Sequence, residues 1–213
     1  MKALAPLFFV ILMSAAAAPA RAREGDYHVA VTPFAGYRMG GSIGAEGDQP
    51  DVELDDASAF GLIVNFPAED IGVEARTEWE LYYSRQTTDV ELAPPGLPPG
   101  VGVDSSYFLA GGNYIAAGET VQPFLAAGIG AARLSVDGAG DDTVFAFGIG
   151  GGAMLFPESR FGLRLEGRVL GAVLDSDSAL FCASGSNGAT CAFRASGDIL
   201  WQWEVSAGAV LRF

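Results

Sequence analysis

The residue types that most often catalyse reactions or hold metals are sparse in this 213-residue sequence. His28 is the only histidine, and Cys182 and Cys191 are the only cysteines. A Ser/His/Asp arrangement needs a base beside its nucleophile, and a metal site needs three or four ligands, which two cysteines without a nearby histidine do not supply. The glycine run from Gly148 to Gly152 lacks the following helix that a dinucleotide site requires. We therefore expect no enzymatic activity, no catalytic residues, no metal site and no cofactor.

The N-terminus has the pattern of a secretory signal peptide. Met1 and Lys2 precede an apolar run, and the small residues around Ala22 provide a cleavage site. The run is shorter than the roughly 20 apolar residues of a membrane-spanning helix. We predict a signal peptide at residues 1–22 and a mature domain at residues 23–213.

Export places the two cysteines in an oxidising compartment. There Cys182 and Cys191 would most simply form a disulfide that closes a ten-residue loop. In the chain-entropy model, such a loop stabilises the fold by about 2–3 kcal/mol.

Acidic residues dominate the charge of the chain. The sequence has 26 acidic and 12 basic residues, and Lys2 is the only lysine. This balance excludes nucleic acid as a partner. Most of the excess acid lies in segments that we interpret as long loops, densest between Asp48 and Asp56. These loops are interpreted either as a solvated acidic surface or as a bridge through divalent cations to anionic lipid.

The remaining charged residues occupy alternate positions of apolar segments. In Ile71–Tyr83, apolar residues at odd positions alternate with Glu and Arg at even positions, which is a strand signal. Phe161–Leu174 and the C-terminal segment Trp201–Phe213 repeat the pattern. Five further strands are predicted at Tyr27–Arg38, Ser58–Phe66, Ser105–Ala116, Val121–Leu134 and Val144–Phe156, which makes eight.

Short and long connections between these strands alternate along the chain. The short ones are Pro67–Asp70, Ala117–Thr120 and Pro157–Arg160, and the long ones are Met39–Ala57, Arg85–Asp104, Ser135–Asp142 and Asp175–Gly197. In an up-and-down antiparallel meander, all long loops then lie at one end, as in transmembrane barrels. Aromatic residues are predicted near both ends: Tyr37, Trp79, Tyr83, Trp201 and Trp203 by the long loops, and Phe66, Phe161 and Phe213 by the short turns. We predict an all-β, eight-stranded antiparallel up-and-down transmembrane β-barrel.

Several segments resemble the eight-stranded outer-membrane β-barrels of Gram-negative bacteria, the OmpA-type and OmpX-type barrels. They are TPFAGYRMGG (Thr32–Gly41), PFLAAGIGAARL (Pro123–Leu134), AFGIGGGAMLF (Ala146–Phe156), FGLRLEGRVLG (Phe161–Gly171) and the C-terminal WEVSAGAVLRF. The resemblance implies a monomer in the cell outer membrane, with extracellular long loops and with outer-membrane lipid and lipopolysaccharide around it. Val205, Leu211 and Phe213 resemble the C-terminal signal that the outer-membrane assembly machinery recognises.

An eight-stranded barrel has an interior just wide enough for side chains to fill. We predict that a charge network of paired Arg and Glu plugs it, comprising Arg38, Glu74, Arg76, Glu78, Glu80, Arg164, Glu166, Arg168, Glu204 and Arg212. The alternative for these residues is the solvated face of a sheet in a soluble protein. A plugged barrel indicates a structural or surface-interaction role. A narrow porin-like channel and a loop-based adhesion or ligand-binding module are the alternatives.

Overall fold

Strands make up all of the regular secondary structure in the part of the chain that the structure describes. The computed structural model describes residues 27–43, 52–68, 75–89, 102–136, 140–157, 159–174, 182–185, 188–191 and 199–213. Within these ranges there is no helix of the length and apolarity needed to cross a membrane.

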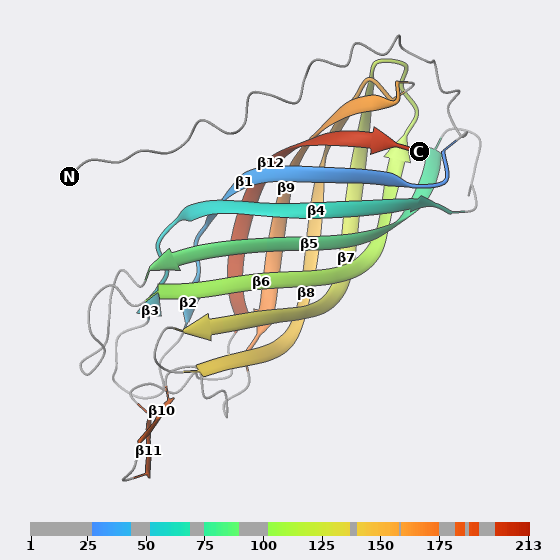
Figure 1. Cartoon of the computed structure of the whole chain (residues 1–213). Helices are drawn as coiled ribbons and strands as arrows, with labels where there is room; N and C mark the ends of the chain where they lie inside the picture. The colour runs from blue at the N-terminus through green and yellow to red at the C-terminus, as the bar shows by residue number, and fades with distance from the viewer. Residues whose placement is uncertain are drawn as a thin grey trace, which may run out of the picture.

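Eight strands form a closed antiparallel barrel in the order β1-β12-β9-β8-β7-β6-β5-β4 (Figure 1). They are β1 (Ala30–Met39), β4 (Ala57–Pro67), β5 (Ala75–Asp89), β6 (Gly102–Ala116), β7 (Val121–Val136), β8 (Gly140–Leu155), β9 (Phe161–Val173) and β12 (Ile199–Arg212). Consecutive barrel strands are neighbours, and β12 pairs with β1 to close the cylinder. This architecture confirms the predicted fold class.

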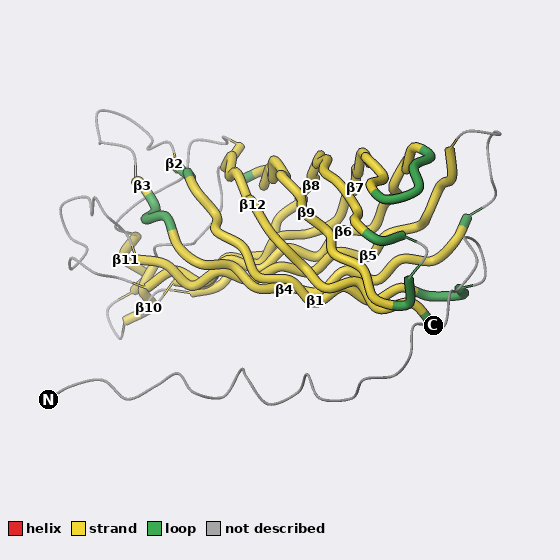
Figure 2. The backbone as a smooth tube through the Cα atoms, turned by 90° about the horizontal axis from the view of Figure 1, so that it is seen from above, coloured by secondary structure: helices red, strands yellow, loops and turns green. Residues whose placement is uncertain are grey.

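Two small hairpins mark one end of the barrel. They are β2 (Ser42–Ile43) with β3 (Val52–Glu53), and β10 (Cys182–Gly185) with β11 (Gly188–Cys191). Both lie at the end opposite the C-terminus (Figures 1 and 2). We call that end the long-loop end, and the other end, which carries the connection between β6 and β7, the short-turn end.

The stagger of the strands follows from their register. Stepping from Thr143 through directly paired residues on each neighbouring strand leads around the barrel to Ala153, ten residues further along β8. With strands about 4.8 Å apart and a rise of about 3.3 Å per residue, this stagger tilts the strands by about 40° and gives a backbone radius of about 8 Å. Each residue then advances about 2.5 Å along the barrel axis.

Several strands are longer at the long-loop end than the sequence predicts. β5 continues to Asp89, beyond the predicted end at Tyr83, and only three residues separate β7 from β8. The predicted long connection at 135–142 is therefore wrong, and the alternation of short and long connections fails there. Ser135, Asp141 and Asp142 give this segment the polarity of a loop, but Ser135 pairs with Asp141 and Val136 with Gly140, so both strands continue into it.

Outward-facing side chains form an apolar belt around the barrel. Buried and exposed residues alternate along the strands, and all eight barrel strands carry exposed large apolar or aromatic residues. When the stagger is taken into account, the belt covers about ten residues along each strand, or about 25 Å, which matches the apolar band of a transmembrane barrel.

Aromatic side chains gather at the two edges of the apolar belt. The long-loop edge has Tyr37, Phe145, Trp201 and Trp203, the short-turn edge has Phe66, Trp79, Tyr114, Phe161 and Phe213, and aliphatic residues such as Leu81 and Leu165 lie between them. The predicted position of Trp79 at the long-loop edge is wrong. Trp79 pairs with Phe66 near the short-turn end, because β5 extends six residues beyond Tyr83.

Candidate functional site

A group of four charged side chains lies in the middle of the barrel interior. Arg164, Glu166 and Arg168 occupy alternate positions of β9 and therefore point inward together, while Glu80 comes from β5, on the opposite wall. The Nη2 atoms of Arg164 and Arg168 lie 2.8 and 2.5 Å from the Glu80 carboxylate, and 2.8 and 2.7 Å from that of Glu166. All four side chains are buried. We call these residues the central charge group; its two cations and two anions cancel.

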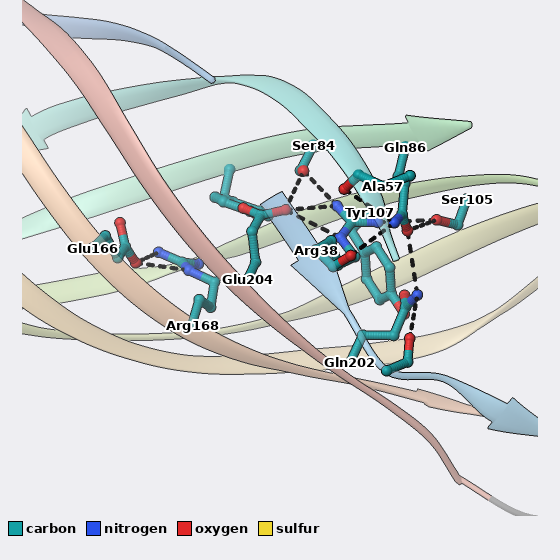
Figure 3. A network of polar contacts seen from close by, with 12 residues as sticks. Arg38, Ala57, Ser84, Gln86, Ser105, Tyr107, Glu166, Arg168, Gln202 and Glu204 are labelled. Atoms are coloured by element: carbon teal, nitrogen blue, oxygen red, sulfur yellow. Dashed lines mark hydrogen bonds and ion pairs between the residues drawn. The ribbon is translucent and has the colours of Figure 1, made fainter. Parts of the chain in front are cut away.

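A second ion pair lies nearer the long-loop end (Figure 3). Arg38 Nη2 is 2.9 Å from Glu204 Oε2, and Arg38 Nη1 donates to Ser105 Oγ at 2.9 Å. Ser84 Oγ donates to Glu204 Oε2 at 2.8 Å. The Arg38 guanidinium also lies 4.9 Å from the centre of the Tyr107 ring. Each charge is therefore paired and has further polar or aromatic partners, as buried ions require.

Tyr82 connects these two groups. Its hydroxyl donates to Glu204 Oε1 at 2.6 Å, and the Arg168 guanidinium lies 4.0 Å from the centre of its ring. β1, which is separated from β5 by β4, contributes Phe34, whose ring stacks on that of Tyr82 with 5.7 Å between the ring centres. One side chain thus contacts a member of each charge group.

A third set of charged residues lies at the short-turn end. Arg76 Nε is 3.2 Å from Glu78 Oε1, and the Tyr27 hydroxyl also donates to Glu78. Arg212 Nη1 donates to the backbone oxygen of Ser159 at 2.8 Å. The structure therefore places nine of the ten predicted lumen residues inside the barrel or at this mouth. The tenth, Glu74, lies outside the described residues.

Small residues on β8 make room for the central charge group. A Cβ atom at Gly150 would lie 2.7 Å from Glu166 Oε1 and 3.0 Å from the backbone oxygen of Gly167. The glycine run that could suggest a nucleotide site therefore provides space for a buried carboxylate.

Some buried polar atoms in the same region have no hydrogen-bond partner among the described residues. They are Thr32 Oγ1, both side-chain polar atoms of Asn113, and the Nη1 atoms of Arg164 and Arg168. Buried polar atoms of this kind are the usual partners of internal water. The interior around the central charge group is therefore polar enough to be hydrated.

The interior has a different character at the long-loop end. Inward-facing residues of β6, β7, β8 and β12, together with Leu174 and Leu54, form a layer that we call the apolar lid, and none of its side chains is more than 7% exposed: Leu54, Val103, Leu134, Val136, Val144, Leu174 and Leu200. The Leu54 backbone N–H donates to the Gly41 oxygen at 2.9 Å, which fixes Leu54 over the barrel. Gly41 has a φ of 128°, and a Cβ there would lie 3.2 Å from Leu54 Cδ1.

An acidic cavity of about 740 Å³ opens beside the apolar lid. Its lining includes Glu53, Asp55, Asp56 and Asp89. Asp56 Oδ1 accepts a hydrogen bond from the Gly40 backbone at 2.9 Å, so this carboxylate also holds the rim together. Among the described residues, no group of three or more His, Cys, Asp or Glu is arranged to hold a metal ion.

The other predicted residues lie outside the lumen. The backbone register places Cys182 directly opposite Cys191 in the β10–β11 hairpin, and their disulfide stays a prediction. Val205 and Phe213 are exposed on the outer face, and the role of the C-terminus in assembly also stays a prediction. His28 is exposed at the short-turn end, where its backbone N–H donates to the Phe213 oxygen at 2.8 Å.

Neither the neutral partners of the ion pairs nor the apolar lid is predicted from the sequence. Ser84 and Gln86 continue the alternation of β5 beyond its predicted end, so extending the period-two pattern would place both inside the barrel. The lid residues are apolar although they face inward. Their own sequence therefore does not distinguish them from residues of the apolar outer face, and only the pairing with neighbouring strands shows the side to which they point.

Comparisons with known proteins connect this architecture to solved structures. No protein-family model and no curated protein matches the chain. The crystal structure of Neisserial surface protein A matches with a TM-score of 0.52 and 17% sequence identity, over 87% of this chain and 97% of that one. Outer membrane protein OprG of Pseudomonas aeruginosa matches with a TM-score of 0.46 and 14% identity, over 91% and 98% of the two chains. The outer membrane protease OmpT of Escherichia coli matches with a TM-score of 0.45 and 9% identity, over 92% and 99%.

These similarities concern the fold, which by itself assigns no activity. The closed antiparallel cylinder of eight strands and the match with Neisserial surface protein A support the same fold. The chain therefore has the fold of the eight-stranded outer-membrane β-barrels, as its sequence resemblance predicts.

Proposed function

We propose that the mature chain, residues 23–213, is a non-enzymatic integral protein of the bacterial outer membrane, exported by a signal peptide at residues 1–22. The observation that carries this proposal is the distribution of polarity: a belt of exposed apolar side chains with aromatic edges surrounds an interior of buried ion pairs. In water, this arrangement would expose the apolar outer face of the barrel to solvent and bury its charged inner face. In a bilayer, each face has a suitable environment.

The barrel acts in this proposal as a closed scaffold with a structural or surface-interaction role. The long-loop end faces outside the cell, and the barrel is a monomer surrounded by outer-membrane lipid and lipopolysaccharide. Two features favour a closed interior over a channel. The buried charges are paired with one another, and an ion crossing the apolar lid would lose its hydration without gaining polar partners.

Gel mobility and cell fractionation test membrane insertion. Unboiled protein refolded into lipid vesicles should migrate differently from boiled protein, and the expressed chain should fractionate with outer membranes. Cleavage at the predicted site is checked by the mass of the mature chain. A monomeric, detergent-free protein in the periplasm would contradict the proposal.

Planar bilayer recordings test the closed interior. Wild-type protein should give no reproducible conductance steps. The double variant Leu134→Ser/Leu200→Ser makes the apolar lid polar and is the matched comparison, since both side chains are fully buried in it. Regular ion-sized steps from folded wild-type protein would favour the channel.

A loop-based ligand-binding module is the second candidate. The acidic cavity of about 740 Å³ beside the apolar lid favours it, because it offers a concave surface outside the barrel wall. Replacing the loops that surround this cavity should abolish binding of a surface ligand while the barrel remains folded.

A further inference from the structure

A groove interrupts the apolar belt on the wall formed by β4 to β7. It has a volume of about 360 Å³, and its lining includes Leu62, Leu81, Tyr83, Phe108, Ala110 and Ile129. The rings of Tyr83 and Phe108 lie 4.7 Å apart. Ala110 is the small residue among these large side chains, so the surface is hollow where its neighbours project. Such a groove can accommodate a flexible hydrocarbon chain.

Two cations lie above this groove, on the side of the long-loop end. Arg85 follows Tyr83 on the outer face of β5, and Arg133 follows Ile129 and Ala131 on that of β7. Their side chains are 55% and 60% exposed. Ser106 lies directly opposite both residues, so their backbones are separated by two strand spacings, or about 10 Å.

The rest of the outer surface at the same end has a different character. On β1 and β12, the corresponding edge of the apolar belt consists of Tyr37, Met39, Trp201 and Trp203. In the part of the chain that the structure describes, Arg85 and Arg133 are the basic side chains on the outer wall near the long-loop end. The cations are therefore concentrated on the wall that has the groove.

Both arginines have acidic neighbours that a ligand could replace. Arg85 Nη2 lies 2.9 Å from Asp104 Oδ2, and Arg133 Nη2 lies 2.9 Å from Asp141 Oδ2. Both ion pairs are exposed to solvent. Exposed ion pairs contribute little to the stability of a protein, because water competes for both partners. Ser106 on β6 lies directly opposite both arginines and Thr143 on β8 lies opposite Arg133, whereas Asp104 and Asp141 are two residues further toward the long-loop end on the same two strands. A phosphate at the edge of the belt would therefore meet the guanidinium groups first.

We propose that this wall binds one lipid with two phosphates, of the chemical class of lipid A, with an acyl chain in the groove and the phosphates at Arg85 and Arg133. The inference rests on the proposed function, because it requires the apolar belt to lie in a bilayer. Arg recognises phosphate through paired N–H donors, and two arginines about 10 Å apart suit a diphosphorylated headgroup better than a single phosphate.

Native mass spectrometry of the full chain in detergent, with added diphosphoryl lipid A, monophosphoryl lipid A or phosphatidylethanolamine, tests the proposal. Wild-type protein should retain diphosphoryl lipid A in preference to the other two lipids. Arg85→Gln/Arg133→Gln should weaken its binding by roughly thirtyfold, and Arg85→Lys/Arg133→Lys, which keeps both charges but not the paired N–H donors, should weaken it less. Ala110→Trp fills the groove and should also weaken binding.

The controls are Ala207→Trp on the outer face of β12 and Arg160→Gln at the short-turn end, both of exposed residues outside the groove. Neither should change lipid binding by more than about twofold, within the usual effect of a distant surface substitution. Gel mobility shows for each variant that the barrel is folded.

Either of the following outcomes overturns the inference alone: folded, membrane-inserted wild-type protein shows no preference among the three lipids, or the folded glutamine variant and Ala110→Trp bind diphosphoryl lipid A like wild type. An equal loss in Ala207→Trp would also overturn it. Wild-type protein that does not insert into vesicles at all contradicts the proposed function as well.

Discussion

The strongest test of the outer face is an arginine in the middle of the apolar belt. Leu165 on β9 is 43% exposed and lies between Ala153 and Ala207 on the neighbouring strands. It is four residues from Phe161, which lies at the short-turn edge of the belt, and four residues correspond to about 10 Å along the barrel axis. In a belt about 25 Å high, Leu165 is therefore close to the middle.

Leu165→Arg should destabilise the folded barrel in lipid by about 2–4 kcal/mol, since that is the range for Arg near the bilayer midplane. This corresponds to a decrease of about 30- to 900-fold in the folding equilibrium constant. Leu165→Ala is the reference at the same position, because it separates the loss of the leucine from the burial of the charge. At the edge of the belt, Phe161→Arg relative to Phe161→Ala should cost no more than about 1 kcal/mol.

The assay is reversible urea unfolding in lipid vesicles, followed by the fluorescence of the three tryptophans. The slope of the unfolding free energy against urea concentration must be the same for all variants, so that differences between their midpoints report differences in stability. If folded Leu165→Arg is within about 1 kcal/mol of Leu165→Ala, or if Phe161→Arg costs as much as Leu165→Arg, Leu165 does not face the hydrocarbon.

The other predictions concern the interior, the C-terminus and the cysteines. Glu80→Gln should lower the free energy of unfolding in urea by about 3–5 kcal/mol, because it leaves Arg164 and Arg168 with Glu166 as their shared carboxylate. Glu53→Gln at the exposed rim should have little effect on this free energy. Equal effects of the two substitutions would argue against an essential ion pair. Deleting Phe213 should lower the amount of barrel in the outer membrane, measured by fractionation, and normal levels would rule out its role as an assembly signal. Cys182 and Cys191 should resist alkylation until a reductant is added, and labelling of the native, oxidised chain would disprove the disulfide.

Much of the barrel could be predicted from the sequence because its two faces have opposite polarity. Along β9, Leu163 and Leu165 alternate with Arg164 and Glu166, and a period of two is enough to assign both the strand and its faces. Strand ends were harder to predict. Beyond Tyr83, β5 continues with Ser84 and Arg85, where both faces become polar and the pattern loses its contrast.

The partners of the charged residues could not be predicted from their own strand. Glu80 lies 84 residues before Arg164, and their contact depends on the position of β5 opposite β9 in the closed cylinder. The apolar lid has the same origin. Val103 and Leu200 belong to strands distant in the sequence, and only the register and stagger of the barrel bring them into one layer.

The apolar lid also separates two regions with different demands on sequence. Below it, each member of an Arg–Glu ion pair must keep its counterion, so a substitution in one strand constrains another. The lid itself consists of leucine and valine side chains, which carry no charge that a covering segment would have to neutralise. Apart from the segment that carries Leu54 and Asp56, connections at this end can consequently be exchanged, lengthened or recharged without an electrostatic penalty in the wall below, which makes them a suitable place to graft foreign peptides for display.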